Sequence, residues 1–436
     1  MTVHAPTGAP TGALPAALPE DGARAVEEAA RRLAGVVATT PLEPSARLSA
    51  ATGARVRLKR EDLQVVRSYK VRGAYNLIAQ LGERERARGV VCASAGNHGQ
   101  GVAYACAALG VPGRVYLPRT TPRQKRDRIA ALGGEHVETL VVGDTYDDSA
   151  AAAAAWAEGT GATLVPAFDH PRTMAGQGTV ALEVVEQLAA LGEDPPDVLV
   201  VPVGGGGLIA GMLTWLTRRH PGVRVVGAEP LGAPSMAAAV RAGGPVLLDS
   251  VDTFVDGASV RRVGEATHPV VAAAGAELVT VPEGAVCVEM LAMYQTDGII
   301  AEPAGALATA ALLQGLGVRE GQSVVCVVSG GNNDVSRYAE IVERALVHEG
   351  RKHYFLVEFP QEPGALRRFL DEVLGPDDDI THFEYVKRNN REFGPALVGI
   401  EVPSPDDLPG LLQRMEAAPP TFERITGDEP LYRYLL

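Results

Sequence analysis

Cysteine is scarce in this sequence: four residues in a chain of 436. Cys92, Cys106, Cys287 and Cys326 lie far apart in apolar stretches, without the paired spacing of zinc ligands or of a disulfide framework. We therefore expect buried, reduced thiols and no metal site, as is typical of cytoplasmic proteins.

Long apolar runs are also absent, since no stretch reaches the roughly 18 uninterrupted apolar residues of a membrane-spanning helix. Residues 1–21 are rich in alanine and proline but have neither the basic start nor the continuous apolar segment of a signal peptide. We expect a disordered tail over 1–21, no membrane partner and a cytoplasmic location.

Positive charge is in deficit, with a formal net charge of -13. Such a chain repels phosphate backbones, so nucleic acid is excluded as an expected partner, whereas a small zwitterionic substrate is not. The length of 436 residues, with an apolar fraction of 46%, predicts two or three folded domains.

From Arg55 to His348, short apolar segments alternate with helical patterns, which indicates an α/β domain with parallel strands joined by helical crossovers. The alanine-dense segment 149–158 falls where a crossover helix is due, and alanine is the best helix former. The candidate strands are 90–93, 114–117, 137–142, 198–201, 223–228 and 324–328.

After His348 the pattern changes to that of a ferredoxin-like βαβ unit. We expect strands at 354–359, 381–387 and 396–402 and helices at 364–374 and 408–416. The predicted domains are therefore 22–348, for the α/β body, and 349–436, for a small α+β domain.

Lys70 is the first residue with chemical potential. It lies between aromatic and apolar neighbours in Ser68–Ala74 at the start of a helical pattern, and partial desolvation would lower its pKa and free its amine for a Schiff base. Taken alone, such a segment more often marks an ordinary surface lysine.

A glycine-rich turn at 93–101 follows the strand at 90–93. Its amides and the Asn97 side chain could hold a ligand oxygen, although Asn97 would serve equally well as a helix N-cap. His98 is expected to position the loop and not to act as a catalyst.

Four consecutive glycines, Gly204, Gly205, Gly206 and Gly207, follow the strand at 198–201 and open a helix. Backbone amides at a helix N-terminus attract an anion such as a phosphate. Residues 205–210 also fit a loosened dinucleotide fingerprint, with Glu229 where the ribose-binding acid would stand, so an NAD-dependent oxidoreductase is an alternative. That alternative leaves the other glycine turns unexplained.

A fourth turn, 328–333, places Ser329 at the end of an apolar strand, where open α/β sheets bind ligands. By itself this Ser-Gly-Gly is an ordinary tight turn.

In their order along the chain, the four segments resemble those of the tryptophan-synthase-β-like (fold type II) pyridoxal-phosphate enzymes, and within them the threonine ammonia-lyases (EC 4.3.1.19). The likeness covers roughly residues 37–436 and extends to the segments Lys59–Gln64, Asp256–Val260 and Glu302–Ala306. The sequence departs from the family pattern at Tyr69, where phenylalanine is commoner, and at Arg261, where lysine is commoner.

The resemblance implies a catalytic body of two subdomains, the smaller formed by roughly 65–165, with pyridoxal 5'-phosphate as cofactor. Lys70 would hold the cofactor and move the Cα proton, Asn97 would bind the ring hydroxyl, Gly204–Gly207 the phosphate, and Ser329 would face the pyridine nitrogen. The substrate carboxylate would be held by Ser94, Ala95, Gly96 and Asn97.

The implied reaction is loss of water from L-threonine to give an enamine that hydrolyses to 2-oxobutanoate and ammonium, the first step of isoleucine synthesis. Serine would yield pyruvate by the same route, because a pocket discriminates over one methyl by only about 1 to 3 kcal/mol. Serine racemase or serine dehydratase activity is the nearest alternative. In related racemases a Glu and a nearby Asp hold a metal; here Glu229 is present but Ser235 stands at the acidic position.

The C-terminal part resembles the single ACT-like domain of the feedback-regulated enzymes, which implies isoleucine as an allosteric inhibitor. Gly364, Leu366 and Phe383 are the candidate effector residues. The alternatives are an oligomerisation domain that binds nothing and, for the whole chain, a non-catalytic amino-acid sensor. We expect a homo-oligomer, either a dimer or a tetramer.

Overall fold

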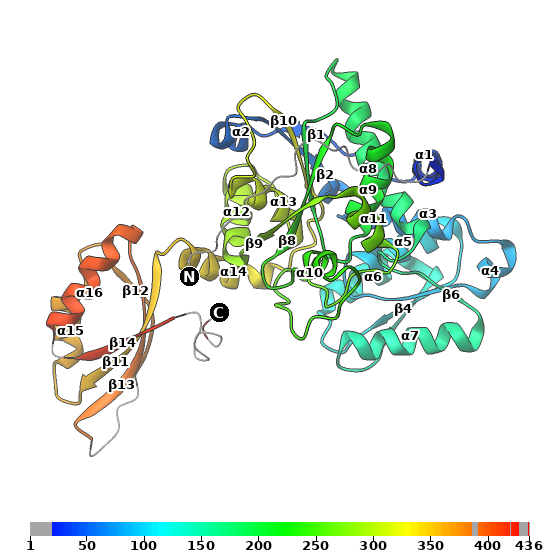
Figure 1. Ribbon diagram of the computed structural model, residues 1–436. Coiled ribbons are helices and arrows are strands. Elements are labelled where there is room, and N and C mark those ends of the chain that lie inside the picture. The colour runs from blue at the N-terminus through cyan, green and yellow to red at the C-terminus, as the bar shows by residue number, and fades with distance from the viewer. Residues whose placement is uncertain (1–19, 386–390, 419, 427–434, 436) are drawn as a thin grey trace. The chain divides into compact units, whose positions relative to one another are not determined.

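The computed structural model describes residues 20–385, 391–418, 420–426 and 435 (Figure 1). Of the expected tail, residues 1–19 lie outside the described residues, while Glu20 and Asp21 already begin helix α1 (Glu20–Leu33). An acidic first turn and basic last turn suit this helix, because they complement its dipole. None of the described helices is long and apolar enough to cross a lipid bilayer.

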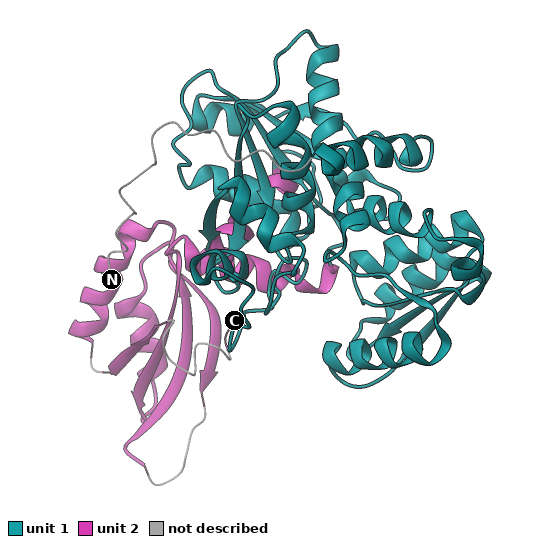
Figure 2. Ribbon diagram, turned by 45° about the vertical axis from the view of Figure 1, so that its right-hand side comes forward, with its two compact units in different colours: residues 1–282, 296–333 teal, residues 283–295, 334–436 magenta. Residues whose placement is uncertain are grey.

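By its contacts the chain forms two compact units (Figure 2). The first comprises residues 1–282 and 296–333, and the second comprises 283–295 and 334–436. This division differs from the expected boundary at His348, because helix α12 (Glu283–Gln295) packs on helix α14 (Tyr338–His348). The packing is tight: a Cβ added at Gly284 would lie 2.4 Å from the His348 Cβ.

A six-stranded sheet with the order β1-β2-β10-β7-β8-β9 forms the centre of the first unit (Figure 1). All neighbouring pairs are parallel except β1 with β2. The strands are β1 (Leu42–Pro44), β2 (Arg55–Arg60), β7 (Val198–Pro202), β8 (Arg224–Pro230), β9 (Glu277–Val281) and β10 (Ser323–Val328).

Strands β7 and β10 are buried along their whole length because helices cover both faces of the sheet. Leu199 and Val325 join the apolar cluster of helices α1, α8 (Pro171–Ala190) and α9 (Gly207–Arg219). On the opposite face, Cys326 contacts the Ala308 carbonyl of helix α13 (Pro303–Leu313). All four cysteines are buried.

A second, smaller sheet of the first unit is entirely parallel, with the order β5-β4-β3-β6. Helices α3 and α5 contribute to the core on one of its faces, and Ala153 of α7 packs with Val91 and Tyr116 on the other. The elements are α3 (Lys70–Ile78), α4 (Glu83–Arg88), β3 (Val90–Ala93), α5 (Asn97–Leu109), β4 (Gly113–Leu117), α6 (Arg123–Gly133), β5 (Val137–Val141), α7 (Tyr146–Thr160) and β6 (Thr163–Leu164). The crossover helix expected at 149–158 is confirmed by α7.

The second unit contains an antiparallel sheet with the order β14-β11-β13-β12, which is the ferredoxin-like arrangement. Its elements are β11 (Lys352–Pro360), α15 (Ala365–Val373), β12 (Asp379–Tyr385), β13 (Phe393–Glu401), α16 (Leu408–Ala417) and β14 (Thr421–Ile425). Residues 386–387 of the second expected strand lie outside the described residues. Strand β14 was not expected from the sequence, because this edge strand is mostly exposed and has no apolar run.

Short connections complete both units. They include α2 (Ala46–Thr52), η1 (Glu61–Leu63), η2 (Gly134–His136), α10 (Ser235–Ala242), α11 (Thr267–Ala274), η3 (Val335–Arg337) and η4 (Pro405–Asp407).

Helices α8 and α9 approach so closely that their backbones touch at glycines. A Cβ at Gly211 would lie 2.1 Å from the Met174 carbonyl oxygen, and one at Gly178 would lie 2.5 Å from the Gly211 oxygen. Since backbone cannot yield as a side-chain end can, these positions require glycine.

We predict that Gly211→Ala lowers the free energy of unfolding by about 1 to 3 kcal/mol, the usual cost of overpacking a core. Gly222→Ala is the matched control, because a Cβ there meets nothing within 4 Å. Urea denaturation of both variants measures the difference, and equal stability of the two would show that the α8–α9 contact tolerates a methyl group.

Candidate active site

The candidate residues come together because they follow neighbouring parallel strands. Strands β2, β10 and β7 are adjacent, and parallel strands present their carboxyl ends at one edge of a sheet. Lys70 comes after β2 and η1, Ser329 directly after β10, and the four glycines one residue after the end of β7. Asn97 comes from the smaller sheet, at the end of β3.

Ser329 and Lys70 are joined through the backbone. The Tyr69 amide donates to the Ser329 carbonyl at 3.1 Å, and Ser68 forms a β-bridge with Gly330. The Ser329 side chain is buried, and its hydroxyl donates to the Ala304 carbonyl at 3.1 Å. The turn 328–333 therefore lies beside the first residue of α3.

Lys70 begins helix α3 and is half-buried. Its Nζ donates to the Ala167 carbonyl at 3.3 Å and lies 5.1 Å from the centre of the Tyr69 ring. Phe168, which follows Ala167 in the chain, packs on the glycine turn, because a Cβ added at Gly205 would lie 2.4 Å from the Phe168 ring. The segment 167–168 thus links the lysine to the glycine turn.

The glycine turn carries amides without acceptors. Within the described residues, no acceptor takes the N–H of Gly204, Gly205 or Gly206. Gly206 is the N-cap of α9 with a φ of 91°, a left-handed conformation that favours glycine, and Thr267 donates to the Gly205 carbonyl at 2.7 Å. Free amides at a helix N-terminus form an anion-binding site.

The loop 94–97 is half-buried, and a Cβ added at Gly96 would meet nothing within 4 Å. There is therefore open space in front of this loop. The N-cap of α5 is Gly96, so the alternative of Asn97 as N-cap is wrong. The Asn97 side chain instead donates to Glu302 at 2.6 Å and accepts from Asn332 at 2.6 Å.

His98 is buried behind this loop, with Nε2 2.7 Å from the Val165 carbonyl oxygen. Burial lowers the pKa of His98 to about 4, so its ring is neutral near pH 7. This supports the expectation that His98 positions the loop.

Glu229 caps a helix. Its carboxylate is buried at the end of β8 and accepts from the amides of Met236 at 2.6 Å and Ala237 at 2.9 Å, at the start of α10. Burial raises the pKa of Glu229 to about 7. Both Glu229 oxygens are thus hydrogen-bonded to backbone amides, which argues against a ribose site at Glu229. The Ser235 hydroxyl nearby in sequence donates to the Val260 carbonyl.

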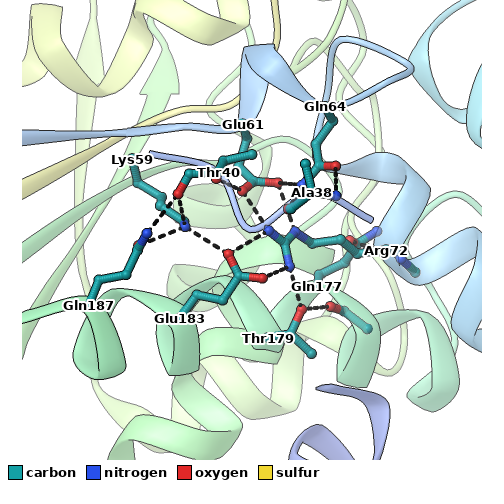
Figure 3. Close-up of polar contacts among 12 residues, drawn as sticks. Ala38, Thr40, Lys59, Glu61, Gln64, Arg72, Gln177, Thr179, Glu183 and Gln187 are labelled. Atoms are coloured by element: carbon teal, nitrogen blue, oxygen red, sulfur yellow. Dashed lines mark hydrogen bonds and ion pairs between the residues drawn. The ribbon is translucent and has the colours of Figure 1, made fainter. Parts of the chain in front are cut away.

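A buried charge cluster, formed by Lys59, Glu61, Arg72 and Glu183, supports the lysine-bearing helix (Figure 3). All five N–H groups of Arg72 are used: two go to Glu61, two to Glu183 and one to Thr179, over 2.6 to 3.1 Å. All three N–H groups of the Lys59 ammonium are also used. They donate to the Thr40 carbonyl, Glu183 and Gln187, over 2.7 to 2.9 Å.

The cluster is electrically balanced, with two cations and two carboxylates. Burial opposes ionisation of Glu61, yet the charges of Arg72 and Lys59 hold the pKa of Glu61 below its usual value. Because Arg72 lies two residues after Lys70 on α3, the cluster ties the start of this helix to β2, η1 and α8. Lys59, whose ammonium is fully hydrogen-bonded, is no free nucleophile.

The residues present fit pyridoxal phosphate. Lys70 is only half-buried and its amine has no carboxylate partner among the contacts of the described residues, the free amides of the glycine turn suit a phosphate, and Ser329 has a neutral hydroxyl. Between them, the open space at Gly96 and the Asn97 amide remain for further ligand atoms. Glu302, Asn332 and Glu183 were not expected at the site from the sequence. Glu302 and Asn332 lie in the segments 302–306 and 328–333, whose pattern could have indicated them, whereas Glu183 lies in a helix without any local signal.

The second unit holds a pocket of about 350 Å³. Gly364, Leu366 and Phe383 all line it, together with Phe359, Leu370 and Tyr385. Gly364 is the N-cap of α15 with a φ of 90°, and Leu366 is 39% exposed. An apolar pocket beside a helix N-terminus has the features needed to hold a small apolar amino acid.

Comparison with known proteins gives two family matches and close relatives. Residues 33–330 match the pyridoxal-phosphate dependent enzyme family, and residues 343–435 match the C-terminal regulatory domain of threonine dehydratase. The chain is 63% identical to the biosynthetic L-threonine dehydratase IlvA of Mycobacterium tuberculosis over 94% of this chain and 95% of the relative.

The solved structures that are similar to the chain include two enzymes of plants. Processed threonine deaminase isoform 2 of Solanum lycopersicum has a TM-score of 0.71 and 34% identity, and it covers 76% of this chain and 95% of its own. Maize serine racemase has a TM-score of 0.67 and 31% identity, and the similarity covers 75% of this chain and 98% of the racemase chain.

We predict that Arg72→Met lowers the free energy of unfolding by about 3 to 5 kcal/mol, because Glu61 and Glu183 lose the guanidinium and share only Lys59, which leaves the cluster with one uncompensated negative charge. Arg119→Met is the matched control; the Arg119–Asp144 pair is exposed and contributes at most about 1 kcal/mol. Thermal and urea unfolding of the full chain test this, and an Arg72 variant as stable as the control would contradict it.

Proposed function

The chain belongs to the biosynthetic L-threonine dehydratases, within the pyridoxal-phosphate dependent enzymes, and from this membership we propose that it converts L-threonine to 2-oxobutanoate and ammonium. The observation that supports this most is that the segment 167–168 contacts both the Lys70 amine and a glycine turn whose amides are free for a phosphate.

The site residues have the following proposed roles. Lys70 attaches the cofactor and then removes the proton at Cα of the substrate, while the β-hydroxyl takes up a proton and leaves as water. Gly204–Gly207 bind the phosphate, and Asn97 binds the ring hydroxyl. The loop of Ser94, Ala95, Gly96 and Asn97 holds the substrate carboxylate in the open space before Gly96. The Ser94 amide is not one of the donors, because it already binds the Tyr116 carbonyl at 3.2 Å.

Pyridoxal phosphate, when bound, supplies an aldehyde for the substrate amine and a conjugated ring that makes Cα–H acidic. Ser329 sets how strongly that ring withdraws electrons. A neutral hydroxyl does not keep the pyridine nitrogen protonated, as a carboxylate would. A negative charge at Cα therefore persists for less time, which favours loss of the β-hydroxyl over transamination. The released enamine tautomerises and hydrolyses in water.

Serine is a second, poorer substrate in this proposal, since it lacks only one methyl. Racemisation is less well supported, although the fold is shared with maize serine racemase. The regulatory domain is that of threonine dehydratase, and Glu229 is engaged at α10, where related racemases hold a metal.

The C-terminal domain, residues 349–436, is proposed to bind isoleucine, with 22–348 as the catalytic body. The isoleucine side chain would lie among Leu366, Phe383 and the other residues that line the pocket, and the Gly364 turn would hold the isoleucine carboxylate. Isoleucine can inhibit only if it binds the less active state of the protein more tightly. We further propose a cytoplasmic homo-oligomer, either dimer or tetramer.

Lys70→Ala should yield a folded protein that has lost threonine turnover and the visible absorption of the lysine-bound cofactor. Borohydride reduction of the wild-type protein, followed by peptide mapping, tests the attachment. Label on Lys59 or Lys125 would overturn the assignment; both amines already pair with carboxylates, at Glu183 and Asp256.

Phe383→Ala should raise the isoleucine concentration for half-inhibition by about ten- to a hundredfold, because an aromatic contact of roughly 1.5 to 3 kcal/mol is removed. Phe422→Ala is the matched control, since Phe422 packs on Phe355 and does not line the pocket. Steady-state rates with and without isoleucine decide it, and equal effects in both variants would place the effector elsewhere.

A further inference from the structure

The side chain of Asn97 is held at both ends by other side chains. Its Nδ2 donates to Glu302 Oε1 at 2.6 Å, and its Oδ1 accepts from Asn332 Nδ2 at 2.6 Å. The same Asn332 Nδ2 donates to the Val66 carbonyl at 2.8 Å. A chain of three hydrogen bonds therefore runs from Val66 through Asn332 and Asn97 to Glu302.

The backbone carbonyl at one end sets the direction of the whole chain. A carbonyl only accepts, so Asn332 must turn its NH₂ group toward Val66. Asn97 must then offer its oxygen to that NH₂ group, and its own NH₂ faces the Glu302 carboxylate. The direction follows from acceptor chemistry even though oxygen and nitrogen of an amide look alike.

Glu302 is well suited to terminate this chain. It is the N-cap residue of α13, and it is 5% exposed. A Cβ on Gly330 would lie 2.3 Å from Glu302 Oε1 and 3.3 Å from Asn97 Nδ2, so both groups adjoin the turn after Ser329. Burial, reinforced by Asp256, raises the pKa of Glu302 to about 7, against the hydrogen bond from Asn97 and the charge of Lys125.

We propose that Glu302 and Asn332 are positioning residues that fix the direction of the Asn97 amide, so that Asn97 offers an N–H to the ring hydroxyl of bound pyridoxal phosphate. The inference rests on the proposed function. A primary amide has two N–H groups, and Glu302 takes one of them. A donor at this place stabilises the ionised ring oxygen over the protonated hydroxyl.

The test uses the full-length chain, stripped of cofactor and titrated with pyridoxal phosphate. Glu302→Ala should weaken binding roughly tenfold, the effect of losing one such hydrogen bond. Its bound cofactor should also absorb more at the shorter, ultraviolet wavelength of the form with a protonated ring hydroxyl. Glu302→Gln, which keeps an acceptor oxygen, should restore both properties.

Thr309→Val is the matched control. It removes a buried hydroxyl from the same helix, α13, without touching Asn97, and should change neither affinity nor spectrum. A change of the same size in this control would show that Glu302 acts only through the stability of α13 and would overturn the proposal.

Asn332→Ala provides a second route should Glu302→Ala fail to fold. It should shift the spectrum in the same direction, because the Asn97 oxygen loses its donor. Wild-type affinity and spectrum in the folded variants would refute the positioning role while leaving the proposed function intact. A wild-type chain that binds no pyridoxal phosphate would instead refute the proposed function.

Discussion

The active-site half of this protein depends on a balanced set of buried charges. Arg72 shares its five N–H groups among Glu61, Glu183 and Thr179, and Lys59 completes the set from β2. Buried ions are costly unless every hydrogen-bonding group is satisfied, so this cluster tolerates only one arrangement of its helices and strands. The start of α3, and Lys70 with it, takes its place from that arrangement.

Close backbone packing provides the second constraint. Helices α3, α8 and α9 meet at glycines: a Cβ at Gly176 would lie 2.6 Å from the Arg72 carbonyl oxygen, and one at Gly211 would meet Met174. The charged cluster and these contacts lie on the same helix, α8. Together they fix the distance between the lysine of α3 and the glycine turn that begins α9.

Hydrogen-bond direction then refines the site. Free amides at Gly204–Gly206 leave a place for an anion, and the hydrogen-bonded chain from Val66 to Glu302 fixes the orientation of the Asn97 side-chain amide. In the second unit, the Gly364 turn and Phe383 stand beside one pocket in a domain of separate fold. The proposed catalytic site and the proposed effector site thus lie in different units. Effector binding can change catalysis only if it shifts the protein between conformational states.

The sequence by itself determined the α/β rhythm, the ferredoxin-like order after His348 and the four segments at which ligand binding is proposed. These depend on local features, namely apolar strand cores and glycines at strand ends, which are visible in short stretches of sequence without knowledge of the tertiary contacts. Strand β2 was missed because its alternating basic residues read as exposed, and β14 because it is a short edge strand. Only the tertiary structure paired Arg72 with Glu183, 111 residues away, and Asn97 with Glu302, 205 residues away. Such contacts have no local signal, since they depend on which strands become neighbours in the sheet.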